Sequence, residues 1–252
     1  MKRISGCRRW NSLPMLAAVF MWIGSGSIPV QAQETRETSR TFQAAFLFGG
    51  ISGPATPELE SAISASGFAD NVNSSQGWFS GSSGSLGRYP FTNKESPMTF
   101  TAQYRLRSPI SVGVIIATTG ESETIGHQGF TQSLILNHAA RSIAVTASAR
   151  FKVLRFEFGP AWNQTRVREH VSLPSSPAWT TENKPGFIAG ASLAVPVYWH
   201  FYLDAGLQYR YIGSSVIGPY TPTAYAEKSA TFPATKLNFS HWFFGIGPGI
   251  RF

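Results

Sequence analysis

A period-two pattern of apolar and polar side chains marks the stretch FYLDAGLQYRY, residues 201–211. Its odd positions are apolar or aromatic, from Phe201 to Tyr211, whereas its even positions include Asp204, Gln208 and Arg210. Successive side chains of a β-strand point to opposite faces. A strand with lipid on one face and a polar barrel interior on the other shows this division. The stretch therefore predicts a transmembrane β-strand.

Seven further stretches show the same period of two. They span residues 42–51, 98–107, 110–119, 141–151, 154–163, 186–196 and 239–252. Each is about 9–14 residues long, close to what a tilted strand needs to cross a bilayer. The even number of strands returns the chain to its starting side.

Short and long connections alternate between these stretches. The connections near 108–109, 152–153 and 198–200 are tight, whereas 52–97, 120–140, 164–185 and 214–238 are long. Short periplasmic turns and long extracellular loops are typical of outer-membrane barrels. We therefore expect an all-β, antiparallel up-and-down transmembrane β-barrel of about eight strands. The alternative is a soluble lipocalin-type barrel, which would direct its apolar face inward.

The composition agrees with a lipid-facing surface. Charged residues make up 13% of the chain and aromatic residues another 13%, with 24 glycines, whereas soluble domains carry about 25% charged residues. The formal net charge is +8, but four basic residues (Lys2, Arg3, Arg8 and Arg9) lie near the start of the chain. The other basic residues are scattered rather than clustered, which argues against a nucleic-acid partner.

The first 32 residues have the pattern of a cleaved signal peptide. Basic residues precede an apolar run at 13–23, and Val30-Gln31-Ala32 matches the small-x-small cleavage pattern. The apolar run is too short for a membrane anchor. We expect a signal peptide at 1–32, a short segment at 33–41 and the barrel at 42–252. The single cysteine, Cys7, lies in the leader.

Residues 42–252 resemble the small OmpA-like outer-membrane barrel family, most sharply in the final stretch HWFFGIGPGIRF. Barrels of that family end on an aromatic residue preceded by apolar residues at alternate positions. The matching positions here are Trp242, Phe244, Ile246, Ile250 and Phe252. The resemblance implies that the barrel-assembly machinery recognises this last strand. Larger family members carry a peptidoglycan-binding domain after the barrel, and none is expected here.

Two further features of the last strand follow from its residue types. Pro248 cannot donate to a strand ladder, so we expect a bulge or a locally broken hydrogen bond there. Gly245, Gly247 and Gly249 should point inward and leave space for larger side chains in the lumen.

Charged side chains should lie on the inward face of the strands. The candidates for a lumen ion-pair network are Arg105, Arg150, Arg155, Glu157, Asp204, Arg210 and Arg251. A buried charge without a partner costs several kcal/mol, so we expect Glu157 and Asp204 to bridge several arginines. Either these residues plug the lumen or they line a small pore with a weak preference for anions. The interior of an eight-stranded barrel is just wide enough for side chains, which favours the plug.

No catalytic, metal or cofactor site is predicted. The histidines (His127, His138, His170, His200 and His241) lack the i, i+4 spacing of a zinc protease site. The pair His170-x-Ser172 is similar to a motif of lipid A deacylase barrels. In those enzymes the motif lies on a lipid-facing strand, whereas here it falls in a loop.

The long connections are candidates for a recognition surface. Residues 57–68 predict a short lid helix with Leu59, Ala62 and Ile63 on one face, and 76–87 is rich in Gly and Ser. Aromatic residues that could form contacts are Trp78, Phe79, Tyr89, Phe91, Trp179, Tyr220 and Tyr225. The simpler alternative is a set of solvated loops with a lid helix.

The predicted function is that of a monomeric, non-enzymatic, surface-exposed protein in the outer membrane of a Gram-negative-type envelope. Its expected partners are outer-membrane lipids and lipopolysaccharide, the barrel-assembly machinery and an extracellular ligand of the loops. The first alternative is a porin-like narrow channel or small-solute conduit, and the second is a lipid-modifying enzyme.

Overall fold

The computed structural model describes residues 42–52, 56–75, 97–107, 109–128, 132–170, 178–180, 184–222 and 231–252. The expected signal peptide at 1–32 and the segment at 33–41 lie outside these ranges. Within them, no helix has both the length and the apolar character needed to cross a membrane.

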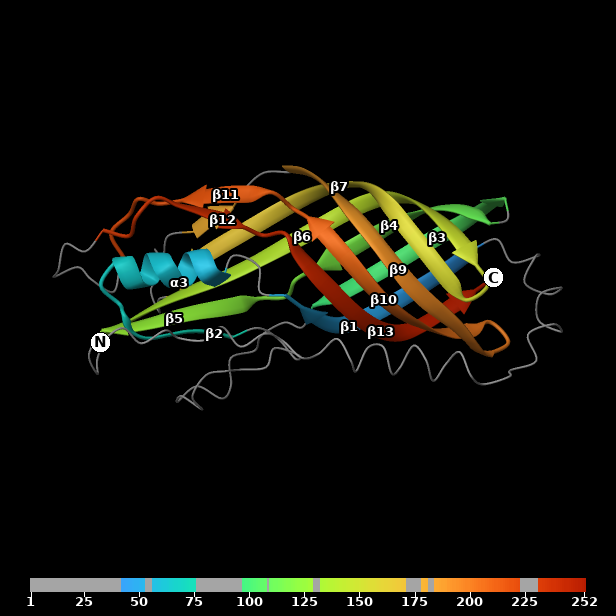
Figure 1. Ribbon diagram of the computed structural model, residues 1–252, viewed down its shortest axis with the longest axis horizontal. Helices are drawn as coiled ribbons and strands as arrows, with labels where there is room; N and C mark the ends of the chain where they lie inside the picture. Colours follow the sequence, from blue (N-terminus) through green and yellow to red (C-terminus); the bar gives the residue numbers. More distant parts are fainter. Residues whose placement is uncertain are drawn as a thin grey trace, which may run out of the picture. The chain divides into compact units, whose positions relative to one another are not determined.

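Eight antiparallel strands pair in a closed ring (Figure 1). In ring order they are β1 (Phe42–Ile51), β3 (Met98–Arg107), β4 (Ile110–Thr118), β6 (Gln132–Phe151), β7 (Leu154–Glu169), β9 (Lys184–Tyr198), β10 (Phe201–Tyr211) and β13 (His241–Arg251). β13 pairs with β1 and closes the ring. Closure leaves no open edge within the ring. The predicted fold, an antiparallel up-and-down barrel of eight strands, is confirmed.

The strand bounds agree with the prediction closely at the tight connections. β1, β3 and β10 have the predicted bounds, and β4 ends one residue earlier than predicted. Lys152 and Trp199 adopt positive φ angles of 56° and 42° in the tight connections between β6 and β7 and between β9 and β10. Such angles are typical of two-residue hairpin turns, whose twist matches that of the flanking strands.

The exterior of the ring is apolar and its interior is buried. In β7, Phe156, Phe158 and Trp162 are 47%, 60% and 49% exposed, whereas Arg155 and Glu157 are 1% and 4% exposed. Exposed apolar side chains occur in the same alternation on six of the other strands, whereas on β9 the outward side chains from Phe187 to Val195 are half-buried and alternate with more deeply buried inward ones. Soluble proteins do not expose an apolar surface of this extent. The apolar exterior therefore rules out the lipocalin-type alternative and identifies a transmembrane barrel.

The described parts of the long connections contain one helix and five short strands in addition to the barrel strands. The first contains α3 (Thr56–Ala65) and β2 (Asp70–Ser75), and the second contains β5 (Ser122–Gln128). The third contains β8 (Ala178–Thr180), and the fourth contains the hairpin of β11 (Ser214–Ile217) and β12 (Thr235–Asn238). We call these elements, together with β6 before Arg141 and β7 after Gln164, the cap. The labelled cap elements α3, β2, β5, β11 and β12 lie at one end of the barrel (Figure 1).

The second connection shows why the prediction missed strands here. β6 begins at Gln132, nine residues before the predicted start at 141, and pairs with β5 along this added length. Leu134 and Leu136 face a buried core, but their neighbours Ser133 and Asn137 are polar. This hairpin lies beyond the part of the barrel whose exterior is apolar. A prediction based on apolar residues at every second position therefore does not detect it. The lid helix, in contrast, is confirmed as α3, with Leu59, Ala62 and Ile63 buried.

Pro248 interrupts the pairing of β13 with β1 without causing a bulge. Paired residues run from Gln43–Arg251 to Ala45–Gly249 and resume at Phe48–Ile246 with unchanged register. On its other side β13 keeps a regular register, with Pro248 opposite Leu203 of β10. The expected local break is therefore present on the β1 side, and the expected bulge is not.

Candidate functional site

An ion pair between non-neighbouring strands crosses the lumen. Arg155 of β7 donates a hydrogen bond through Nη2 to Oδ2 of Asp204 of β10, at 2.7 Å. The Nε atom of Arg155 lies 3.9 Å from Oε2 of Glu157. All three side chains are almost completely buried. Because β9 lies between β7 and β10 in the ring, the pair joins two separate parts of the barrel wall.

Two glutamines extend this pair toward a third strand. Gln208 donates through Nε2 to Oε1 of Glu157 at 2.6 Å, and Gln103 of β3 donates to Oε2 of Glu157 at 3.3 Å. Arg210 donates through Nη2 to Oε1 of Gln208 at 2.9 Å and also to the Oγ1 atom of Thr99 of β3. We call these seven residues, Thr99, Gln103, Arg155, Glu157, Asp204, Gln208 and Arg210, the lumen network.

Aromatic rings pack beside the network over glycines of β13. The Tyr202 ring lies where a Cβ on Gly249 would be, 2.2 Å from the nearest ring carbon, and the Phe243 ring takes the same place at Gly245. The guanidinium of Arg251 lies 4.4 Å from the centroid of Tyr202, and that of Arg210 lies 4.2 Å from the centroid of Phe243. Such contacts are favourable cation–π interactions. The predicted inward glycines therefore make room for two aromatic rings, each covered by an arginine.

The lumen network connects three strands through buried side chains. It links β3, β7 and β10 around the ring, and each of its side chains is at most 4% exposed. Buried charges require partners of this kind to offset desolvation. The arrangement holds the walls together and fills the barrel section at this level.

The structure distributes the seven predicted lumen charges unevenly. Arg155 pairs directly with Glu157 and Asp204, whereas Arg210 reaches Glu157 through Gln208. Arg251 lies on Tyr202, and Arg150 donates through Nε to the backbone oxygen of Lys152 at the turn, at 2.7 Å. Arg105 is half-buried near the end of β3. Two glutamines and a threonine thus accept or donate hydrogen bonds in the network, where the prediction named only carboxylates as partners of the arginines. Their inward positions in the alternating pattern could have identified them from the sequence.

The cap has an apolar core of its own. Leu59 and Ile63 of α3 belong to the same cluster as Leu136 of β6, Val167 of β7 and Leu237 of β12, so all four long connections contribute. The buried members of this cluster are Leu59, Ala62, Ile63, Phe68, Leu134, Leu136, Ala140, Val167, Ile212, Ile217, Phe232, Leu237 and Phe239. Because they come from opposite walls of the ring, the cap packs across the end of the barrel.

A buried histidine and a partly buried tyrosine accompany this core. His138 lies on β6 beyond the end of β4, with Nε2 3.4 Å from Oγ1 of Thr124 of β5. Burial lowers the pKa of His138 to about 4. Burial, and then the nearby carboxylate of Glu169, raise the pKa of Tyr220. Both side chains are therefore neutral at pH 7.

The fold resembles small outer-membrane barrels. The attachment invasion locus protein Ail of Yersinia pestis, solved with the heparin analogue sucrose octasulfate, matches with a TM-score of 0.41 and 9% identity, covering 83% of this chain and 99% of that one. OprG from Pseudomonas aeruginosa matches with a TM-score of 0.42 and 11% identity, covering 84% and 94%. Neisserial surface protein A matches with a TM-score of 0.36 and 12% identity, covering 84% and 97%.

Neither a family model nor a curated protein matches the sequence. The assignment of the fold therefore rests on the closed ring of strand pairings and on its apolar exterior, both observed directly.

The remaining predicted residues are placed as follows. Trp242, Phe244, Ile246 and Phe252 are exposed on the exterior of the barrel, and Ile250 is half-exposed there. His170 is exposed and donates its backbone N–H to the oxygen of Ile135. Trp78, Phe79, Tyr89, Phe91, Ser172, Tyr225, the 76–87 stretch and the side chain of Trp179 lie outside what the structure describes. Among the described residues, no group of His, Cys, Asp and Glu is arranged to hold a metal ion.

Proposed function

We propose that the protein is an integral outer-membrane barrel with a closed lumen and a folded extracellular cap that serves as an interaction surface, without enzymatic activity. The observation that carries this proposal is the shared core of the four long connections above a filled lumen. Loops held on a rigid scaffold are common binding surfaces.

The lumen network favours a closed barrel over the channel alternative. Arg155, Asp204 and Glu157 are buried and bonded, so an open path would require these links to break. Breaking a buried ion pair costs about 3–5 kcal/mol when one partner is left behind. A narrow channel or solute conduit therefore has no preformed path through this layer.

The exposed side of the cap offers the proposed interaction surface. Val216 of β11 is 64% exposed, and Lys236 and Asn238 of β12 are exposed beside it. The apolar cluster beneath this hairpin includes Ile217 and Leu237, which hold it in place. We propose that this hairpin is part of the surface that meets an extracellular ligand.

Labelling of single cysteines on intact cells tests the orientation. The chain has one cysteine, Cys7, in the expected signal peptide, so an introduced cysteine would be the only one after cleavage. A large membrane-impermeant maleimide should label Val216→Cys on intact cells. The matched position at the other end, Lys152→Cys, should react only after the outer membrane is opened. The opposite labelling pattern would contradict an extracellular cap.

Conductance and lipid analysis test the closed lumen and the absence of catalysis. The purified barrel should give no single-channel events in a planar bilayer, and steady conductance would support the channel alternative instead. Lipid A mass spectra should be identical in cells with and without the protein. A mass change that depends on His170 would support the enzyme alternative.

We also propose that the barrel-assembly machinery reads the outward apolar and aromatic residues at the end of the chain, Trp242, Phe244, Ile246, Ile250 and Phe252. Phe252 packs near Phe42 of β1, at a ring-centroid distance of 6.3 Å, at the seam that closes the ring. Replacement of Phe252 by Ser should lower the amount of folded barrel in the outer membrane while the purified variant still refolds in detergent. Normal assembly of this variant in cells would contradict the proposal.

A further inference from the structure

An apolar row runs across five neighbouring strands on the exterior of the barrel. Its members are cross-strand partners, in the order Phe46, Phe100, Ile116, Ile143 and Trp162. The last four are 38–54% exposed, so they face the surroundings of the barrel. Large apolar and aromatic side chains in this arrangement match the hydrocarbon region of a membrane.

The next row toward the cap is polar on three of the five strands. Phe48, Met98, Thr118, Arg141 and Gln164 pair in this order, two residues beyond the apolar row. Arg166 follows Gln164 on the same face of β7 and is also exposed. Two to four residues of a tilted strand span roughly 5–10 Å, the depth of the headgroup layer. Arg141 and Arg166 therefore lie where lipid headgroups begin.

The two arginines are diagonal neighbours without a carboxylate partner among the described residues. Arg141 pairs with Gln164, so Arg166 lies on the adjacent strand one same-face position further on. Diagonal neighbours on one face of a sheet are about 7–8 Å apart, and long side chains can converge across that distance. Arg168, in contrast, is neutralised by Glu121 at 3.3 Å.

The outward charges are confined to this sector of the ring. Among the described side chains of the eight barrel strands, those that point outward and carry a charge are Arg141, Arg166 and Arg168. The opposite wall ends toward the cap in aromatic residues instead: Phe187, Tyr209, Tyr211 and Trp242 pack on one another there. If the arginines served only to attract the barrel to an anionic membrane surface, they would not need to be confined to one wall.

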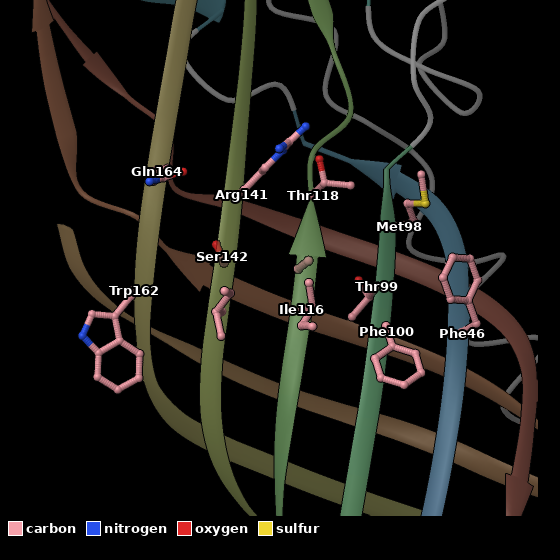
Figure 2. A pocket seen from close by; sticks show the side chains of 12 residues that line it. Phe46, Met98, Thr99, Phe100, Ile116, Thr118, Arg141, Ser142, Trp162 and Gln164 are labelled. Atoms are coloured by element: carbon pink, nitrogen blue, oxygen red, sulfur yellow. The ribbon is translucent and has the colours of Figure 1, made fainter. Parts of the chain in front are cut away.

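A groove connects the apolar and polar rows. It has a volume of about 870 Å³ and is lined by residues of both rows, with Trp162 at one side and Phe46 at the other. Figure 2 shows Arg141 and Gln164 on the cap side of Trp162, Ile116 and Phe100. The groove thus offers an apolar floor with Arg141 at its rim, and Arg166 lies outside the lining, two residues beyond Gln164 on β7. An amphipathic molecule with acyl chains and an anionic headgroup has the matching chemistry.

We propose that this groove binds a phosphorylated lipid of the outer leaflet, with acyl chains along the apolar row and a phosphate between Arg141 and Arg166. Guanidinium groups bind phosphate oxygens through paired hydrogen bonds, and two arginines at diagonal positions of neighbouring strands are close enough for both side chains to reach one phosphate. The inference rests on the proposed outer-membrane location. Lipopolysaccharide carries both acyl chains and phosphates, so its lipid A portion is the probe of choice.

Fluorescence of Trp162 reports occupancy of the groove. The barrel is reconstituted in vesicles of phosphatidylcholine with brominated acyl chains, which quench exposed tryptophans. Added diphosphoryl lipid A should displace the brominated lipid and restore the fluorescence that is absent in Trp162→Phe. Each arginine near an anionic surface contributes roughly a five-fold preference. The double variant Arg141→Gln/Arg166→Gln should therefore need roughly 25-fold more lipid A for half recovery.

A matched variant and two further ligands make the test decisive. Lys152→Gln removes one positive charge at the opposite end of the barrel and should behave as the unaltered protein, whereas Arg141→Gln alone should need roughly five-fold more lipid A. Equal titration curves for the arginine variant and the unaltered protein would overturn the inference. It would also be overturned if dephosphorylated lipid A bound equally well, or if inorganic phosphate displaced lipid A and showed a soluble-anion site.

The same vesicles separate this inference from the proposed function. Resistance of the barrel to protease and to unfolding by detergent at room temperature reports insertion. An inserted barrel with no lipid A preference would contradict the groove site alone. A barrel that does not insert would contradict the proposed membrane location and the groove site together.

Discussion

Arg155 and Asp204 form a 2.7 Å ion pair inside the barrel although their strands, β7 and β10, are not neighbours. Both side chains are almost completely buried, so the pair lies in a region of low dielectric constant. Attraction in such a region offsets desolvation only when both partners remain. The pair therefore makes the stability of two separate wall segments depend on each other.

Removal of one partner of this pair should destabilise the barrel strongly. Asp204→Leu leaves the guanidinium of Arg155 buried with Glu157 at 3.9 Å, and we expect a loss of about 3–5 kcal/mol in the free energy of unfolding. Urea unfolding in lipid vesicles measures the loss. The double variant Arg155→Met/Asp204→Leu should lose less than Asp204→Leu alone. A larger loss in the double variant would argue against an energetically coupled pair.

Two glycines in the lumen should respond differently to the addition of one methyl group. At Gly249 a Cβ would lie 2.2 Å from the Tyr202 ring, so Gly249→Ala displaces that ring and should cost about 1–3 kcal/mol. At Gly206 the nearest heavy atom is Cβ of Ser192 at 3.2 Å, and Gly206→Ala should cost less. The urea midpoints of the two variants provide the comparison. Similar midpoints would mean that Tyr202 does not pack on Gly249.

The lipid-facing side of β10 should reject charge according to depth. Ala205 points outward near the middle of the strand, and an arginine at the bilayer midplane costs about 2–4 kcal/mol. Tyr211 points outward at the cap end of the same strand, where arginine costs about 0–1 kcal/mol. Ala205→Arg should therefore lower the free energy of unfolding more than Tyr211→Arg. Equal losses would contradict the placement of the strand across the membrane.

The cap should lose stability as the pH falls from 6.5 toward 4. The pKa of His138 is about 4 in the fold and 6.5 in a solvated chain, so the opened cap binds a proton first in this range. The stabilising effect of neutral His138 is complete above pH 6.5 and is lost as the pH approaches the folded value. Hydrogen exchange of α3 and β5 amides at pH 7.5 and pH 5 measures the change. His138→Phe should weaken the pH dependence, and an unchanged dependence would point to another group.

The strand number and the two faces of each strand could be predicted from the sequence. A transmembrane strand has lipid on one face and the barrel interior on the other. Apolar residues therefore mark the outward face in the sequence, and polar residues mark the inward face. Phe156 and Glu157 illustrate this, since neighbouring positions differ from about half exposed to 4% exposed. The tight connections could also be predicted, because only a few residues separate the alternating pattern of one strand from that of the next.

Contacts between strands that are far apart in the ring were decided only by the tertiary structure. Alternation places Arg155, Glu157, Asp204 and Gln208 inside, but the closure of the barrel decides which of them meet. Arg141 and Arg166 lie on neighbouring strands, and their proximity was decided by the register of β6 against β7. The cap strands also depend on long-range packing, because beyond the membrane the exterior is polar and the apolar signal that marks the barrel strands is missing.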